Sequence, residues 1–183
     1  MSATVVETRR VLQPGPARHS RVLTALGQQG RQLLGSIGEG ESLESGLIRL
    51  FAEAGEASGT FRLLGGALGD AFYHVALPDP DSPRAVDYGA PIHIEGGAWL
   101  IGGSGSFGPS VNGGPLIHLH GALAAIDGRG HGGHLNNGKC IVGAGGVRVL
   151  MHLGAGFSQA ADPETGFSTF FPQSETSHDR RAH

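Results

Sequence analysis

Two histidine-bearing segments, joined by a short link, carry most of the structural information in this chain. The first, Pro115–Gly121, reads PLIHLHG, and the second, Gly128–Leu135, reads GRGHGGHL. Side chains two apart on a strand share a face, so His118 and His120 project side by side while the apolar residue between them points the other way. The run 115–126 is therefore predicted as a strand with one apolar face and one face bearing two imidazoles.

The link between the two segments sets their register. If Ile126–Gly128 is a three-residue hairpin loop with a left-handed glycine at its end, His120 lies opposite His134. Opposed residues share a face with Cβ atoms about 4.5–5.5 Å apart, so His118, His120 and His134 would then converge. A two-residue turn would instead pair His120 with Leu135 and send His134 to the other face. The metal hypothesis therefore depends on this register.

Three imidazoles without a thiolate indicate a transition-metal site. His118, His120 and His134 suit zinc first, with nickel, copper or iron as alternatives. Three protein ligands leave one coordination position open, which is typical of a reactive zinc site rather than a closed structural one. The competing interpretation is that these are ordinary polar residues on a half-exposed sheet.

The remaining candidate residues carry weaker signals. His131 pairs with Leu123 in the same register, off the cluster. Glu95 is a candidate general base or further ligand, although solvent exposure is the simpler expectation for it. Cys140 lies in an apolar stretch and is expected to be a buried, inert thiol. Three further histidines lie singly on strand runs and are expected at the edge of the core: His74, His93 and His152.

Elsewhere the chain predicts one helix and many strands. The helix, Leu43–Ala54, has an apolar stripe at helical spacing, a capping hydroxyl at Ser42 and a glycine stop at Gly55. One helix against many antiparallel strands is an α+β layer fold. The other predicted strands are Thr60–Leu64, Ala71–Leu77, Pro91–Glu95, Ala98–Gly103 and Val147–Leu153.

Glycine is the compositional outlier, at 33 of 183 residues. The pairs at 65–66, 69–70 and 96–97 are predicted to separate strands. The runs Gly102–Gly105 and Gly143–Gly146 lack the lysine and the following helix of a phosphate-binding loop, so they are expected to form turns and close backbone contacts.

Composition sets the outer limits. Apolar residues make up 39% of the chain and the net charge is −3, so neither a strong electrostatic grip on nucleic acid nor a charge-driven disordered chain is expected. No apolar run is long enough for a membrane span, and a single cysteine with no signal-peptide pattern predicts a cytoplasmic protein. Three segments are predicted: an N-terminal arm at 1–29, one domain at 30–173 and a loose tail at 174–183.

The histidine segments resemble the PPC domain, the plants-and-prokaryotes conserved domain found beside AT-hooks in plant nuclear proteins. The match consists of His118-Leu119-His120, Asp127-Gly128 and Gly132-Gly133-His134-Leu135, followed by Gly138. Weaker similarity extends the resemblance to about Ser36–Phe171. It implies an antiparallel sheet with one or two packed helices, a homotrimer, and a metal site at His118, His120 and His134.

PPC members are usually labelled DNA-binding or regulatory. The plant proteins hold the minor groove with an Arg-Gly-Arg-Pro hook, whereas here Gly128-Arg129-Gly130 is followed by His131. The first functional hypothesis is thus a non-catalytic, oligomeric metal-binding module with a regulatory role. The second is a zinc-dependent hydrolase or lyase that uses metal-activated water, and the third is a direct DNA-binding regulator.

Overall fold

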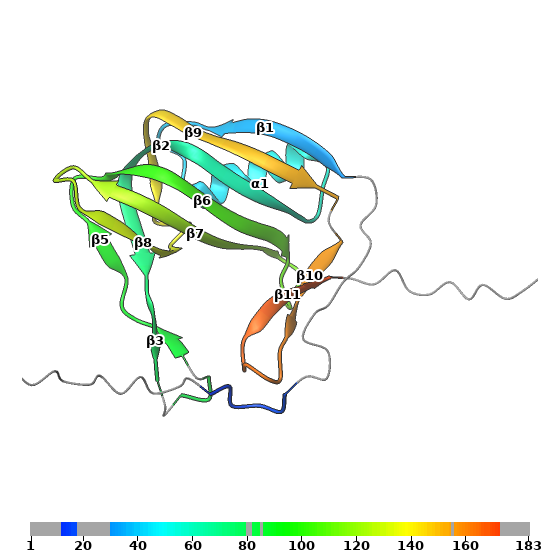
Figure 1. Ribbon diagram of the computed structural model, residues 1–183. Coiled ribbons are helices and arrows are strands. Elements are labelled where there is room, and N and C mark those ends of the chain that lie inside the picture. Colours follow the sequence, from blue (N-terminus) through cyan, green and yellow to red (C-terminus); the bar gives the residue numbers. More distant parts are fainter. Residues whose placement is uncertain (1–11, 18–29, 80–81, 85, 155, 173–183) are drawn as a thin grey trace, which may run out of the picture.

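The computed structural model describes residues 12–17, 30–79, 82–84, 86–154 and 156–172 of the chain. Its main feature is a seven-stranded antiparallel sheet in the order β1-β9-β2-β6-β7-β8, with β5 paired to β2. One face of this sheet is covered by helix α1, and two small hairpins, β3–β4 and β10–β11, extend from it (Figure 1). The elements are β1 Arg31–Ile37, α1 Leu43–Ala54, β2 Gly59–His74, β3 Ala76–Pro78, β4 Val86–Tyr88, β5 Ile92–Ile94, β6 Ala98–Pro109, β7 Pro115–Ala125, β8 Gly130–Leu135, β9 Ile141–Leu153, β10 Phe157–Ala161 and β11 Ser168–Pro172.

Helix α1 has the predicted bounds, and its ends explain why. The Ser42 hydroxyl accepts a hydrogen bond from the Ser45 amide at 3.0 Å, and Gly55 ends the helix in the left-handed conformation. Its apolar stripe packs on the sheet, where the Phe51 ring stacks on Phe107 at 4.0 Å between centroids. The helix therefore seals one face of the sheet and leaves the other uncovered by helix in the described residues.

Strand β2 organises the sheet because it runs for 16 residues and has several partners. Its first half pairs with β6 on one side and with β9 on the other. Its last residues pair with β5 and β8, so that Tyr73 lies opposite Leu135 and His74 opposite His134. The strand order β2-β6-β7-β8 therefore closes back on β2, because β8 pairs both with β7 and with the end of β2.

The prediction that glycine pairs break this region into separate strands is wrong. Gly65, Gly66 and Gly69 lie inside β2, where the pairing with β9 shifts register three times between Leu63 and Asp70. Gly66 has a φ of 147° and lies so close to β9 that an added Cβ would be 2.3 Å from the Gly146 carbonyl oxygen. Glycine supports β-bulges for the same conformational reasons that it supports turns.

The glycine runs in β6 and β9 are likewise not turns. Gly102–Gly105 lies within β6 and Gly143–Gly146 within β9. The expectation of close backbone contact is confirmed, since an added Cβ on Gly105 would be 2.5 Å from both the His118 carbonyl oxygen and the Phe61 ring. These residues allow adjacent strands to pack with little side-chain thickness between them.

Several elements were not predicted. The edge strand β1 was missed, and the predicted strand Ala71–Leu77 is divided between β2 and β3. One helix is present in the described ranges, which agrees with the prediction of one or two. It is too short and too polar to cross a membrane.

Most of the predicted arm and all of the predicted tail fall outside the described residues. From the arm, the structure describes residues 12–17, where the Gly15 amide donates a hydrogen bond to the Glu164 carbonyl oxygen at 2.9 Å.

Candidate metal centre

The register that the metal hypothesis requires is present. His118 and His120 lie on β7, and His134 on β8 lies directly opposite His120. The intervening loop has the three-residue form, because the Ala125 amide donates to the Arg129 carbonyl oxygen at 2.9 Å and Gly128 is left-handed with a φ of 82°. Of the two turns considered for the Asp-Gly sequence, the structure has the three-residue one.

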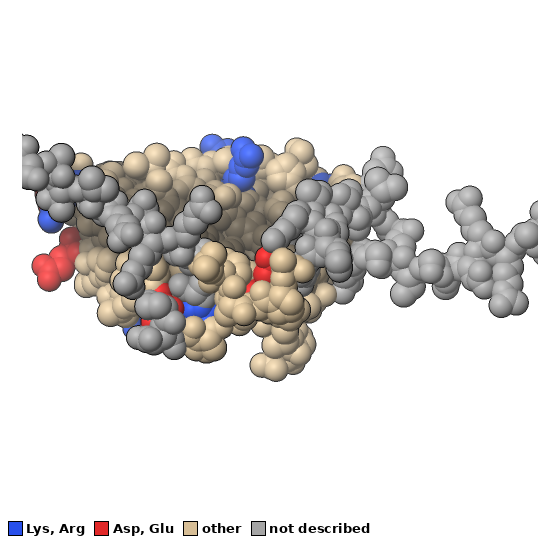
Figure 2. Space-filling view, turned by 60° about the horizontal axis from the view of Figure 1, so that its bottom comes forward, with Lys and Arg blue, Asp and Glu red and all other residues tan. Residues whose placement is uncertain are grey.

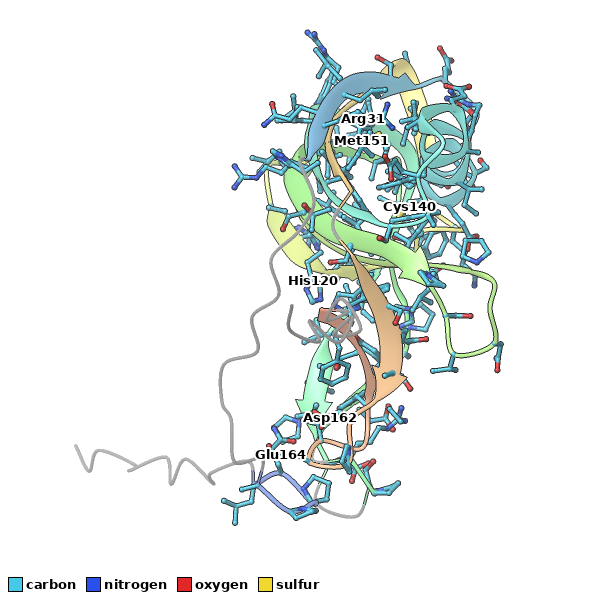
Figure 3. All side chains as sticks on the ribbon, turned by 90° about the vertical axis from the view of Figure 1, so that its right-hand side faces the viewer. Arg31, His120, Cys140, Met151, Asp162 and Glu164 are labelled. Atoms are coloured by element: carbon cyan, nitrogen blue, oxygen red, sulfur yellow. The ribbon has the colours of Figure 1, made fainter. Side chains whose placement is uncertain are left out.

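The three rings meet at one point on the face of the sheet opposite α1. The Nε2 atoms of His118 and His120 are 3.1 Å apart, and one candidate ligand atom from each of the three residues lies within 4.8 Å of the other two. His118 and His120 are exposed, whereas His134 is half-buried. Figure 3 shows His120 at the margin of the sheet, on the side where the β10–β11 hairpin lies.

For His118 and His134, the surroundings favour the neutral imidazole. Although the His118 side chain is exposed, partial desolvation by its neighbours, followed by the charge of His120, lowers its pKa. Burial, followed by His118, His120 and His74, lowers the pKa of His134 to about 4. A metal binds neutral imidazole, so rings that stay unprotonated at pH 7 are in the form that coordination requires.

The donor set fits a divalent transition metal. Two nitrogen ligands of a tetrahedral zinc ion, each about 2.0–2.1 Å from the metal, lie about 3.3 Å apart. The His118–His120 separation of 3.1 Å is close to this value, and the widest separation, up to 4.8 Å, closes with a small ring movement. Furthermore, Nδ1 of His134 is buried without a hydrogen-bond partner among the described residues. A buried polar atom without a partner destabilises the folded state, so this nitrogen calls for a ligand or a bound ion.

The weaker sequence candidates lie outside the cluster. His131 is opposite Leu123 and bonds through Nδ1 to the Tyr73 hydroxyl at 3.0 Å, on the other face of the sheet from His134. Glu95 is exposed and lines a separate hollow together with His93 and His131. No carboxylate in the described part of the chain joins the three histidines.

The remaining sequence interpretations can be placed as well. Cys140 is buried and unpaired, and burial raises the pKa of its thiol, as expected for an inert cysteine. His74 bonds to the Gly89 carbonyl oxygen at 2.9 Å, and His93 stacks on Phe72. Both therefore contribute to local structure.

The surroundings of the cluster were missed by sequence reasoning. A cavity of about 570 Å³ opens beside the histidines, and its other walls come from the β3–β4 and β10–β11 hairpins. These hairpins are short and distant from β7 in the sequence. The aromatic residues near 167–171 and the prolines near 78–83 were the available signals, but neither pattern identifies a partner.

The comparisons with known proteins identify the family. A family model of the Plants and Prokaryotes Conserved (PCC) domain matches residues 25–152. The chain belongs to this family. It is the family abbreviated PPC above, and the resemblance seen in the sequence is thereby confirmed. A search of curated protein sequences gives no significant match.

Solved structures share the PPC fold at low sequence identity. A PPC protein from Pyrococcus horikoshii superimposes with a TM-score of 0.65 at 20% identity, covering 84% of this chain and 99% of its own. A "metal-containing protein" from Archaeoglobus fulgidus gives 0.62 at 20% identity, covering 83% and 99%. A "putative DNA-binding protein" from Ralstonia eutropha gives 0.61 at 20% identity, covering 76% and 90%. At this identity the likeness establishes the fold alone.

Proposed function

We propose that this PPC protein is a non-catalytic metal-binding module in which His118, His120 and His134 hold one divalent transition metal ion, with zinc favoured. The observation that carries the proposal is the β7–β8 register, which brings three imidazoles together on one face of the sheet. The metal-containing description of the Archaeoglobus neighbour supports it independently. When bound, such an ion supplies a Lewis-acidic centre with an open coordination position.

The metal proposal is tested by elemental analysis of the full-length protein purified from zinc-supplemented growth. We expect about one transition-metal ion per chain, and its loss in His120→Ala. His152→Ala is the matched control, because His152 lies on the same sheet face at the β9 register opposite Thr60, outside the cluster. Metal-free wild-type protein that also fails to take up Zn²⁺ on titration would contradict the proposal.

We further propose that the module assembles as a homotrimer. Several large apolar side chains are exposed on the face opposite α1, and a monomer rarely leaves such a group uncovered. Their strand neighbours point inward, since Leu63 and Leu100 are 2% and 3% exposed. The exposed set is Leu34 at 55%, Leu64 at 51%, Trp99 at 63% and Ile101 at 65%.

Trp99 offers a direct test because it is the only tryptophan in the sequence. We expect light scattering to give three times the chain mass, and tryptophan emission to shift to longer wavelength as dilution dissociates the trimer. The double variant Trp99→Ser/Ile101→Ser should be smaller in mass, whereas Val111→Ser, which is exposed away from these residues, should keep the wild-type mass. A wild-type monomer at all concentrations would overturn this part of the proposal.

The Ralstonia neighbour's description favours DNA binding as a second candidate function. Two observations weigh against a strong interaction. The Arg129 guanidinium is paired with Asp127 at 2.7 Å in the hairpin loop, rather than free as in a minor-groove hook. Figure 2 shows the basic and acidic side chains of its visible, described surface scattered rather than gathered.

The DNA candidate is tested by fluorescence anisotropy with a labelled duplex at 50 and 200 mM salt. Binding through phosphates should weaken steeply between these concentrations. Salt-dependent binding of the metal-loaded protein that Arg62→Ala/Arg148→Ala abolishes would assign the interaction to the open sheet face, where both arginines are exposed. Absence of binding at 50 mM salt would remove this candidate. The hydrolase or lyase alternative is less favoured, because Asp87, a carboxylate that lines the cavity beside the histidines, is paired with Arg84 at 2.7 Å.

A further inference from the structure

The cavity beside the histidines is bordered by two hairpins, β3–β4 and β10–β11, each of which is held to its neighbours by hydrogen bonds. The β3–β4 hairpin is tied to β2, since the Gly89 amide donates to the Val75 carbonyl oxygen at 3.0 Å and the Gly89 carbonyl oxygen contacts His74. The β10–β11 hairpin is tied to the β6–β7 loop, where the Val111 amide donates to Gln159 at 3.2 Å. Small-molecule sites are typically preformed hollows of about 300–1,000 Å³, and 570 Å³ falls in this range.

The two hairpins also meet each other on the far side from the sheet. The Arg84 guanidinium lies over the Phe167 ring, 5.1 Å from its centroid, and is paired with Asp87 at 2.7 Å. Phe167 and Asp87 both line the cavity, and the ion pair neutralises the Asp87 carboxylate. The cavity lining thus includes both the three histidines and the Phe167 ring of this contact.

The walls of the cavity are mainly apolar and include rings from both hairpins. The Tyr88 ring is 4.8 Å from His134, tilted by 34°, so it reaches the cluster itself. Phe170 contributes a ring from β11, and Val86 and Leu116 contribute aliphatic surface. An occupant therefore meets nitrogen ligands from the histidines and a mainly apolar wall that includes aromatic rings, interrupted by polar side chains such as Gln159 and Thr169.

We propose that this cavity binds a small molecule with an anionic, metal-coordinating head and a flat aromatic body. The inference rests on the proposed metal site, because three neutral imidazoles leave the full charge of a divalent ion for an anionic head to balance. The head occupies the open coordination position, and the body lies among Tyr88, Phe170 and Leu116. The carboxylate or hydroxamate class provides such heads.

Two hydroxamates test this inference, because they share a chelating head and differ in the body. Calorimetric titration of the zinc-loaded, full-length protein should show benzohydroxamic acid binding at least about tenfold more tightly than acetohydroxamic acid, since only the former buries a ring. Tyr88→Ala and, on the other hairpin, Phe170→Ala should each remove most of this preference. Leu77→Ala is the matched control, since Leu77 is 55% exposed on the β3–β4 hairpin and does not line the cavity.

The outcomes separate the two proposals. Zinc content is measured for every variant, so that loss of the ion is distinguished from loss of the apolar wall. Equal affinity for the two hydroxamates in zinc-loaded wild-type protein would overturn the cavity inference and leave the metal site standing. A preference retained in both Tyr88→Ala and Phe170→Ala would also overturn it. Failure of the wild-type protein to bind zinc would overturn both.

Discussion

The two faces of the main sheet are built from the same strands but serve different purposes. Facing α1, alternate residues such as Leu119 and Leu123 are fully buried, with 0% exposure. Facing away from it, the residues on either side of Leu119 are the exposed histidines 118 and 120. A change of one position along β7 thus moves from the core to the candidate site. The comparison teaches that stability and ligand binding should be separable by single substitutions in this strand.

The largest expected effect is on the covered face. Leu119→Ala should lower the free energy of unfolding by about 2–5 kcal/mol, because it leaves a cavity in a packed core. His118→Ala, one position away on the open face, should change the unfolding free energy of the metal-free protein by less than about 0.5 kcal/mol. Urea unfolding in the presence of EDTA measures both. Similar losses for the two variants would contradict the division between the faces.

The next largest loss of stability is expected in the glycine-rich strand β6, which lies between β2 and β7 in the sheet. Gly105→Ala should cost about 1–3 kcal/mol, because the added methyl would lie 2.5 Å from the His118 carbonyl oxygen and from the Phe61 ring. Gly114→Ala is the matched control, since nothing lies within 4 Å of a Cβ built there. Thermal unfolding of the two variants should separate them clearly. A Gly105→Ala protein as stable as wild type would show that β6 can move away from β7.

A smaller effect is expected at the start of α1, which covers the inner face. Ser42→Ala should lower the unfolding free energy by about 1 kcal/mol, because the Ser45 amide loses its acceptor. Ser42→Asp keeps an acceptor at the cap and should retain most of the stability. Chemical unfolding followed by far-ultraviolet circular dichroism measures both variants. An equal loss in Ser42→Asp would assign the effect to something other than the cap.

The features that could be predicted from the sequence are those set by residues close together in the chain. The register of β7 and β8 could be reduced to two alternatives, because the Asp127-Gly128 loop is local and its type fixes which residues face each other; the structure has the alternative that pairs His120 with His134. Helix α1 was predictable from its cap and its apolar stripe. The glycines of β2, β6 and β9 were misinterpreted because turns and bulges use the same residue for the same conformational freedom.

The cavity walls could not be predicted. They come from hairpins that meet the histidines only after the chain has folded, and no local pattern links Tyr88 or Phe170 to β7. The edge strand β1 was missed for a related reason, since its residues show no strict alternation and its place is set by pairing with β9. Long-range pairing, rather than local propensity, determines both features.

The smallest expected effect at neutral pH concerns His134 and the acid stability of the metal-free protein. Its folded-state pKa of about 4 lies below the ordinary value of 6.5, so the unfolded chain binds the proton more readily. The stability contributed by the neutral ring is therefore fully present above pH 6.5 and is lost as the pH falls from 6.5 toward 4. His134→Gln should unfold like wild type at pH 7.5 and lose less stability than wild type at pH 5. Urea midpoints in EDTA at the two pH values measure this difference.

Ser104→Ala, opposite His120 on β6, removes no titrating group and should keep the wild-type pH dependence. An unchanged slope in His134→Gln would mean that this ring remains solvated in the folded protein, which would contradict a neutral His134 on the open face.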